Sequence, residues 1–190
     1  GLQLTRWSRP LIDVLTASVT SYQSMASYTP SLVSLSGGAG EPEQIDAEIV
    51  SPDYFTVLKV TPALGRTFTR DEDGAPGAAP VAVLSDRLWR QRYGGNPDMI
   101  GKTVRVNDVP LTVVGIMPSG FHTMQPVDVW TPLRPSRKGE GSGNNYGVTA
   151  RLKPGVSWQA ANEELQSDSA RLTRALLGSP DDSRTQPPHS

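Results

Sequence analysis

The stretch from Pro80 to Leu133 constrains the fold more than any other part of this sequence. It combines β-branched runs, a helical pattern and a two-residue turn, each with its own start and stop signals. The predicted elements are a central strand at 81–84, a helix at 86–93 capped by Ser85 and ended by Gly94, a hairpin of 102–106 and 109–117 around Asn107-Asp108, and a strand at 128–133. Almost nothing in the stretch can do chemistry, so it indicates an interaction or force-transmitting domain rather than an enzyme.

Length and composition favour one loop-rich α+β domain. The chain has 190 residues, 36% of them hydrophobic, with 18 Gly and 17 Pro. A chain of this length buries roughly 70% of its unfolded surface, which is enough for a core without covalent staples. The lack of cysteine excludes disulfides, Fe–S clusters and thiol catalysis, and a net charge of −1 gives no general attraction to nucleic acid.

The two ends of the chain carry amphipathic helix patterns, with a hairpin and small strands between them. Apolar residues recur at spacings of three and four from about Arg9 to Ser27, which predicts one long helix. Between the ends, the sequence predicts a hairpin of 28–35 and 44–51, a short helix from Pro52 with Tyr54 and Phe55, an extended piece at 64–68 and a polar turn at 69–74. After the stretch described above come a polar loop at 134–145 and a strand at 146–152. The last helix is capped by Ser157 and has an apolar stripe of Ala161, Leu165, Leu172 and Leu176.

Three consecutive acids, Asp71, Glu72 and Asp73, raise the question of a calcium loop. Such a loop needs alternating ligands and a distant bidentate Glu, and Ala75 and Pro76 break that pattern. A solvated turn is the favoured interpretation.

The histidines and serines do not form a recognisable catalytic motif. His122 and His189 have no second ligand at helical spacing, so a zinc or triad role would require partners assembled by the fold. Ser36, Ser119 and Ser142 lack the flanking glycines of a nucleophile elbow. Structural or surface roles are expected for all five.

Two glycine patterns imitate phosphate-binding loops. Gly37, Gly38 and Gly40 precede a strand, whereas pyrophosphate binding needs the N-terminus of a helix at that point. Gly101-Lys102-Thr103 imitates the end of a P-loop, but Asn96 stands where its first glycine belongs. The second pattern is better explained as the start of the hairpin.

The helix at 86–93 carries both basic and aromatic residues. Arg87, Arg90 and Arg92 beside Trp89 and Tyr93 could serve RNA binding, but the spacing of the two aromatic residues puts them on one helix face, which favours core packing. Three further basic residues in the polar loop are expected to be solvated, with an acidic partner or a lipid headgroup as the alternative: Arg134, Arg137 and Lys138. No catalytic, cofactor-binding or metal-binding residue is assigned, and no cofactor is expected.

Several phrases of the sequence resemble the MacB-like periplasmic core domain of FtsX-like ABC transporter permeases. They are VSPDYFTVLKVTPALGRTF, PVAVLSDRLWRQRYGGNPDMIGKTVRVNDVPLTVVGIMPSGF, DVWTPL and ARLKPGVSWQAANEEL. The similarity covers roughly Tyr22 to Leu177, and the motifs are specific as an ordered set. ALGRTF and LWRQRYGG are most similar to the duplicated or orphan permeases, which often lack an adjacent ATPase gene.

The resemblance implies one core domain, residues 1–178, with two lobes and mixed small sheets flanked by helices. Segments of about 1–60 and 134–178 would build one lobe, about 61–133 would form the inserted lobe, and 179–190 would be a flexible tail. The terminal helices would lead into membrane helices. Excision from a longer protein explains why this chain lacks membrane spans and ATPase motifs.

The function implied by the resemblance is that of a non-catalytic extracytoplasmic domain. It would couple ATP hydrolysis on a separate cytoplasmic subunit to an extracytoplasmic partner or substrate, in export or mechanotransmission. The implied partners are the ATPase subunit, reached through the rest of the permease, a second permease copy, and a periplasmic adaptor or lipoprotein. The implied location is the periplasmic side of an inner-membrane protein, with no role for nucleic acid.

Two other classes of function remain open at the level of sequence. A secreted module that binds a lipid or glycan would need a deep apolar pocket between the lobes. A hydrolase would need a site assembled around His122 or around the acids Asp71–Asp73.

Overall fold

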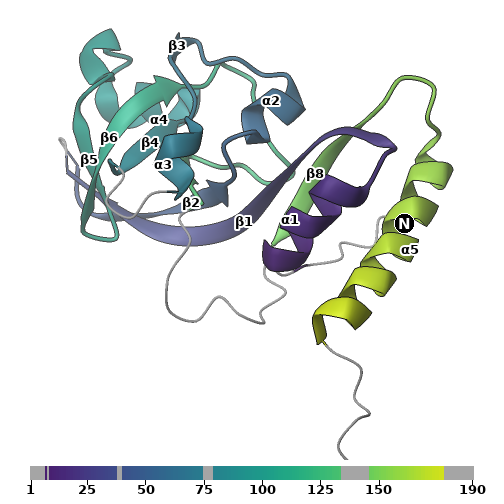
Figure 1. Cartoon of the computed structure of the whole chain (residues 1–190). Coiled ribbons are helices and arrows are strands. Elements are labelled where there is room, and N and C mark those ends of the chain that lie inside the picture. Colours follow the sequence, from purple (N-terminus) through teal and green to yellow (C-terminus); the bar gives the residue numbers. More distant parts are fainter. Residues whose placement is uncertain (1–6, 8, 38–39, 75–78, 134–145, 178–190) are drawn as a thin grey trace, which may run out of the picture.

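The computed structural model describes residues 7, 9–37, 40–74, 79–133 and 146–177, and these form a mixed α+β domain (Figure 1). The predicted α+β class is therefore confirmed. In chain order the elements are α1 (Arg9–Ser18), β1 (Tyr22–Ser36), β2 (Glu43–Val50), α2 (Tyr54–Leu58), β3 (Leu64–Gly65), α3 (Arg70–Gly74), β4 (Val81–Leu84), α4 (Asp86–Tyr93), the 3-10 helix η1 (Pro97–Met99), β5 (Thr103–Val106), β6 (Val109–Ile116), β7 (Val129–Pro132), β8 (Gly147–Leu152) and α5 (Trp158–Leu177).

Six strands pair in a closed ring, which we call the barrel. Its order is β2-β7-β4-β6-β5-β1, and β1 closes it by pairing with β2. The first half of β1 pairs instead with β8, outside the ring, while β3 adds to the edge of β6. The small sheets expected from the sequence are therefore joined through β1 into one mixed sheet.

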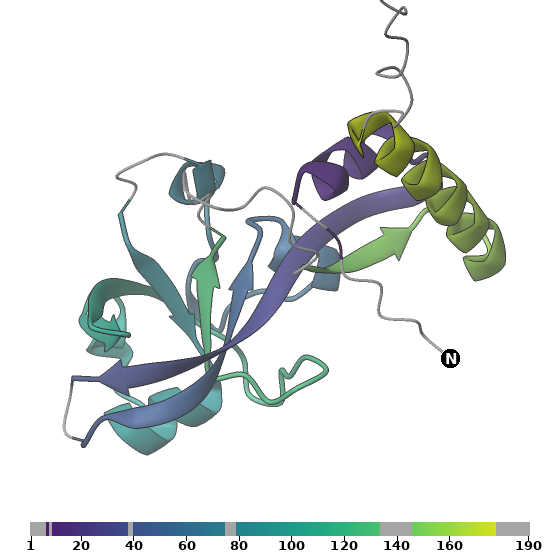
Figure 2. The same ribbon diagram turned by 90° about the horizontal axis from the view of Figure 1, so that it is seen from below.

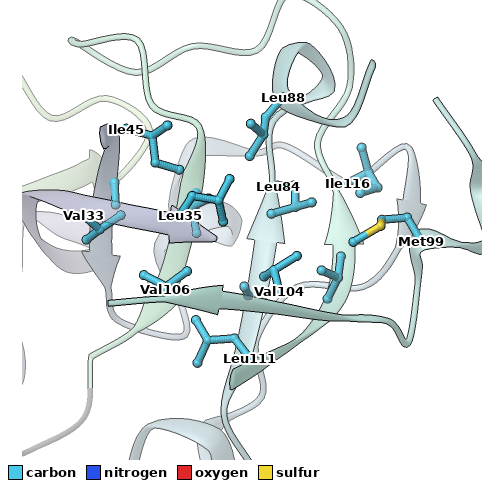
Figure 3. Packing of buried hydrophobic residues seen from close by; sticks show 14 residues of the cluster. Val33, Leu35, Ile45, Leu84, Leu88, Met99, Val104, Val106, Leu111 and Ile116 are labelled. Atoms are coloured by element: carbon cyan, nitrogen blue, oxygen red, sulfur yellow. The ribbon is translucent and has the colours of Figure 1, made fainter. Parts of the chain in front are cut away.

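Apolar side chains from all six strands fill the inside of the barrel (Figure 3). Because side chains alternate along a strand, pairs such as Val33 and Leu35, or Val104 and Val106, point to the same interior. Leu88 of α4 and Met99 of η1 pack against this cluster. Each large side chain buried here stabilises the fold by about 1.5–3 kcal/mol relative to exposure.

A second apolar cluster covers the outside of the barrel beneath α2. Its aromatic members contact each other, and the rings of Phe55 and Trp130 meet edge to face, with centroids 5.8 Å apart and planes at 74°. β4 is buried along its whole length because its side chains pack alternately into the interior cluster and into this second cluster. Its unbroken Val-Ala-Val-Leu run predicted a buried strand.

Both ends of the described chain meet in what we call the terminal layer: α1, the first half of β1, β8 and α5. The two helices lie on the same face of the β1–β8 pair (Figures 1 and 2). Ile12 and Leu15 of α1 pack with Leu165 and Leu172 of α5 in one apolar cluster, and Ala161 joins Tyr22 and others in a second. The helices run antiparallel, so α1 begins and α5 ends at the same end of the layer (Figure 1).

The predicted N-terminal helix is wrong beyond Ser18. Its supposed last turns, with Tyr22 and Ala26, belong to β1. A register shift between Tyr22 and Ser24 lets Tyr22 and Met25 join the same cluster, so the bulged strand imitates a helical spacing of three. Ser and Thr are weak helix formers, and strand pairing prevails over the residual periodicity.

The predicted polar turn at 69–74 is also wrong, because this segment forms the short helix α3. The Glu72 carboxylate accepts a hydrogen bond from the backbone N–H of Thr69 at 2.8 Å, which is half of a Thr-x-x-Glu capping box.

Other local predictions are confirmed. The Ser85 hydroxyl accepts from the N–H of Leu88 and so caps α4, and Gly94 ends that helix in the left-handed conformation. Asn107 and Asp108 have φ of 48° and 63°, as a type I′ turn requires. The loop 134–145, the tail 179–190 and the two terminal residues lie outside the described residues.

Candidate functional site: the joint between the terminal layer and the barrel

The terminal layer and the barrel meet along β1, β8 and α2. Arg151 of β8 donates from Nε and Nη2 to the backbone carbonyl oxygen of Val57, at 3.0 and 2.6 Å. Close by, the N–H of Ser51 donates to the carbonyl oxygen of Ser27, and the Ser51 hydroxyl accepts from the N–H of Ser27. These polar contacts connect segments that are far apart in the chain.

Glu164 joins α5 to the turn between α1 and β1. Its carboxylate accepts from the N–H and hydroxyl of Thr20, both at 2.7 Å, and from the N–H of Ser21 at 2.9 Å. These hydrogen bonds from Ser21 and Thr20 lower the pKa of Glu164 to about 2. The contact is therefore charge-assisted throughout the neutral pH range.

Glu48 is a buried carboxylate on the outside of the barrel, with 3% of its surface exposed. It accepts hydrogen bonds from the Tyr54 hydroxyl at 2.9 Å, the indole N–H of Trp130 at 3.1 Å and the Thr123 hydroxyl at 3.2 Å. All three donors are neutral. Burial, followed by the nearby charge of Glu48, raises the pKa of Tyr54, so the phenol remains a donor.

The geometry around Glu48 serves positioning rather than reaction. Its carboxylate holds α2, β7 and the segment between β6 and β7 together through one residue from each. The surrounding cluster is apolar and includes several aromatic rings, and buried polar groups of this kind stabilise one arrangement of a core when all are satisfied.

Asp128 organises the start of α4. It accepts from the Ser85 hydroxyl at 2.9 Å and forms an ion pair with Arg87. Beside this pair lies a polar cleft of about 280 Å³, which Glu43, Gln91 and others also line. Its guanidinium groups already pair with carboxylates, so the cleft has no surplus charge to attract an ion.

The acids considered for calcium binding have a structural role in part. Glu72 forms an ion pair with Arg66 at 2.7 Å. Burial alone would raise the pKa of Glu72, but hydrogen bonds from Arg66 and Thr69 outweigh burial and lower it. Within the described ranges, no group of three or more His, Cys, Asp or Glu side chains is placed to hold a metal ion.

The histidine and serine candidates are scattered. His122 is exposed in the segment between β6 and β7, with Nδ1 2.9 Å from the carbonyl oxygen of Gly120. Ser36 ends β1 and Ser119 is exposed after β6. His189 and Ser142 lie outside the described residues.

The glycine patterns have conformational explanations. Gly37 follows β1 with φ of 91°, and Gly40 lies against Arg92, whose Cζ would be 3.1 Å from an added Cβ. Gly101 has φ of 85° and precedes β5, as expected for the start of the hairpin. Gly38 is not among the described residues.

The arginines of α4 are used within the fold. Arg87 pairs with Asp128, Arg90 with Asp86, and Arg92 with Glu43. Trp89 and Tyr93 are partly buried against the barrel cluster, which agrees with the core-packing prediction. The loop residues Arg134, Arg137 and Lys138 lie outside the described part of the chain.

Sequence reasoning missed Arg151 at the joint, Glu164 within the terminal layer and Glu48 on the outside of the barrel. Glu164 had a local signal, because it lies three residues after Ala161 in the apolar stripe of α5. Glu48 had none, because it alternates with Gln44 and Asp46 on the side of β2 opposite Ile45 and Ala47. Arg151 had none, because its acceptor is a backbone carbonyl distant in the chain.

Comparison with known proteins defines the class. The MacB-like periplasmic core domain family matches residues 4–168, and the chain belongs to this family. The resemblance of its motifs is thereby confirmed. Among the described helices, none has the length and apolar character needed to cross a bilayer.

Individual relatives agree with this assignment. The chain is 30% identical over 121 residues to the macrolide export ATP-binding/permease protein MacB of Escherichia coli strain K12, covering 61% of this chain and 18% of that protein. Its fold is similar to the periplasmic region of MacB from Actinobacillus actinomycetemcomitans, with a TM-score of 0.69 and 18% identity over 94% of this chain and 86% of the other. The extracellular domain of the noncanonic ABC-type transporter YknZ from Gram-positive bacteria gives a TM-score of 0.62 and 18% identity, over 88% of this chain and 82% of the other.

Proposed function

We propose that this chain is the extracytoplasmic domain of an ABC transporter permease and that it couples cytoplasmic ATP hydrolysis to an extracytoplasmic partner or substrate. The domain is a passive body: ATP is hydrolysed on a separate cytoplasmic subunit and the domain moves in response. Family membership supports the class of protein, and the arrangement of the terminal layer supports the coupling role.

One observation carries the proposal. The start of α1 and the end of α5 lie at the same end of the terminal layer, on two antiparallel helices in contact (Figure 1). A body attached to a membrane at two neighbouring points needs this arrangement. The terminal layer would be its base, and the barrel would project from it along β1.

We further propose that the domain has two lobes, with the boundary in β1 near Tyr28. The sequence placed the boundary near residue 60. However, β2 and α2 pack with the barrel clusters, whereas α1, β8 and α5 pack with each other. The terminal layer is then the lobe built from both chain ends, and the barrel is the inserted lobe.

The proposed partners follow from the class of protein. They are the ATPase subunit, a second copy of the permease, and a periplasmic adaptor or lipoprotein. The Escherichia coli relative is named as both an ATP-binding protein and a permease. Purification of the full-length protein that contains this chain therefore tests whether its ATPase is a separate subunit.

A flexible linker provides the test of coupling. The parent protein is reconstituted in nanodiscs with its ATPase. A spin label at Gln91 on α4, which packs against the barrel, reports the distance to the same label in the second copy. ATP should change this distance. Insertion of ten-residue Gly-Ser segments both before Trp7 and after Leu177 should preserve ATP hydrolysis and abolish the change, because the displacement is no longer transmitted to α1 or to α5.

An ATPase variant that binds but does not hydrolyse ATP serves as the control for turnover. A label distance insensitive to nucleotide in the uninterrupted protein would contradict the proposal. A retained lipid or glycan in native mass spectrometry of the isolated chain would favour the binding-module alternative instead.

A further inference from the structure

We infer that Arg151 is a latch that fixes the barrel to the terminal layer, so that the two move as one rigid body. This inference rests on the proposed function for its biological meaning, but the latch itself is a property of this chain alone. Apart from β1, the closest packing between the two parts is that of α2 against β8. The Arg151–Val57 contact lies in this packing.

The end of α2 explains why a guanidinium is suited to this place. The helix ends in a backbone cap, with Lys59 in the left-handed conformation. The N–H of Lys59 donates to the carbonyl oxygen of Thr56, and the N–H of Val60 donates to that of Phe55. The carbonyl oxygen of Val57 takes no part in this cap, and it accepts hydrogen bonds from Nε and Nη2 of Arg151. A cation at the C-terminal end of a helix is also favoured by the helix dipole.

A second contact prevents rotation about the first. Tyr28 of β1 lies over Gly147 of β8, so that a Cβ added to Gly147 would stand 2.6 Å from the Tyr28 ring. The same ring contacts Tyr54 of α2 at 5.9 Å between centroids. Tyr28 is therefore wedged between β8 and α2, and only glycine leaves room for it.

The two contacts together define a rigid joint. Continuous strand pairing along β1 resists stretching, but a two-stranded connection can still bend and twist. Arg151 at one end of β8 and Gly147 at the other fix α2 to this strand at two separated points. Loss of Arg151 leaves β1 as a hinge, held by the Tyr28 contact and by the hydrogen bonds between Ser27 and Ser51.

Double electron–electron resonance on the 190-residue chain tests the latch. The chain has no cysteine, so spin labels can be placed at Gln91→Cys on α4 and Ser167→Cys on α5, both exposed positions. Arg151→Met keeps the aliphatic stem and removes the donors. We expect the distance distribution to broaden about twofold, the response of an element released from its packing partner.

Arg105→Met is the matched control. Arg105 also donates to a backbone carbonyl oxygen, that of Asp108 at 2.8 Å, but within the β5–β6 hairpin. Its removal should leave the distribution unchanged. A folded Arg151→Met variant with the distribution of the unmodified chain would overturn the inference.

A conservative variant covers the case in which Arg151→Met does not fold. Arg151→Lys keeps the charge and one donor, so it should fold and give an intermediate width. An unchanged width in Arg151→Lys would then overturn the latch. Failure of this experiment leaves the linker test in nanodiscs intact, because that test does not depend on Arg151.

Discussion

The barrel and the terminal layer differ in how the chain builds them. The barrel comes from one continuous segment, about 28–133, and a cluster of apolar side chains fills its interior. The terminal layer joins segments more than a hundred residues apart and is held in part by single polar contacts, such as Glu164 with Thr20. A closed apolar core resists deformation, whereas a polar contact can be released at little cost. The difference indicates that adjustment occurs at the polar contacts within the terminal layer, while the barrel moves unchanged.

The largest effect should come from the barrel interior. Leu84→Ala removes a side chain with 0% exposure from the interior cluster, and we expect a loss of about 2–5 kcal/mol in the free energy of unfolding. Urea unfolding followed by circular dichroism measures this. Leu32→Ala, on the outside of β1 with 65% exposure, is the control and should change little. Equal losses in both variants would contradict the assignment of the core.

The next effect tests the polar contact at the outer face of the barrel. Glu48→Ala leaves the indole N–H of Trp130 and the Tyr54 hydroxyl without their acceptor, at a cost of about 2–3 kcal/mol. Glu48→Gln keeps an acceptor oxygen and should lose clearly less. The difference in urea midpoints between the two variants is the measurement. No difference would mean that the hydrogen bonds do not matter.

A smaller, pH-dependent effect should distinguish the terminal layer. The pKa of Glu164 is lowered in the folded state to about 2, so its contribution is present above the unfolded pKa of about 4.3 and is lost as pH falls toward 2. Glu164→Gln should therefore be less stable than the unmodified chain at pH 7, and the difference should shrink below about pH 4. The rates of hydrogen exchange at the amides of Thr20 and Ser21 measure this loss of stability locally.

Glu163→Gln is the matched control for that experiment. Glu163 is exposed, and its carboxylate accepts a hydrogen bond from the side-chain amide of Gln159, one helical turn before it. Its replacement should leave the exchange of Thr20 and Ser21 unchanged. Faster exchange in both variants would mean that general charge on α5, not the specific contact, holds the turn.

The smallest effect concerns the hairpin turn of the barrel. Asp108 has φ of 63°, which glycine adopts without strain, so Asp108→Gly should stabilise the chain by up to about 1 kcal/mol. Asp46→Gly, at an exposed position in β2, should have the opposite sign, because glycine weakens a strand. Thermal unfolding of both variants measures the pair. Destabilisation by Asp108→Gly would contradict the turn assignment.

The same division explains how far the sequence could predict the fold. Capping by Ser85, the stop at Gly94 and the turn at Asn107-Asp108 depend on neighbouring residues and were predicted correctly. The boundary between α1 and β1 was not, because it depends on pairing with β8, whose partner residues lie more than a hundred positions away. Closure of the barrel by β1 and β2 has no local signature either.

The joint was harder still to predict. At the joint, Arg151 donates to the backbone carbonyl oxygen of Val57, and backbone groups carry no residue-specific pattern. The same holds within the terminal layer, where the backbone N–H groups of Thr20 and Ser21 donate to Glu164. Glu48 gave no signal either, because it alternates with Gln44 and Asp46 on the polar side of β2. Its role became apparent only once Trp130 and Tyr54 were placed beside it.

Depth in the membrane is the most direct test of the account. In the parent protein in nanodiscs, a fluorophore at Ala175 in the last turn of α5 is compared with one at Gln44, which pairs with Ser34 at the far end of β1. A quencher carried on lipid headgroups should quench the label at Ala175 strongly and the label at Gln44 weakly. Stronger quenching at Gln44, or none at either position, would contradict the proposal that the terminal layer is the membrane-facing base.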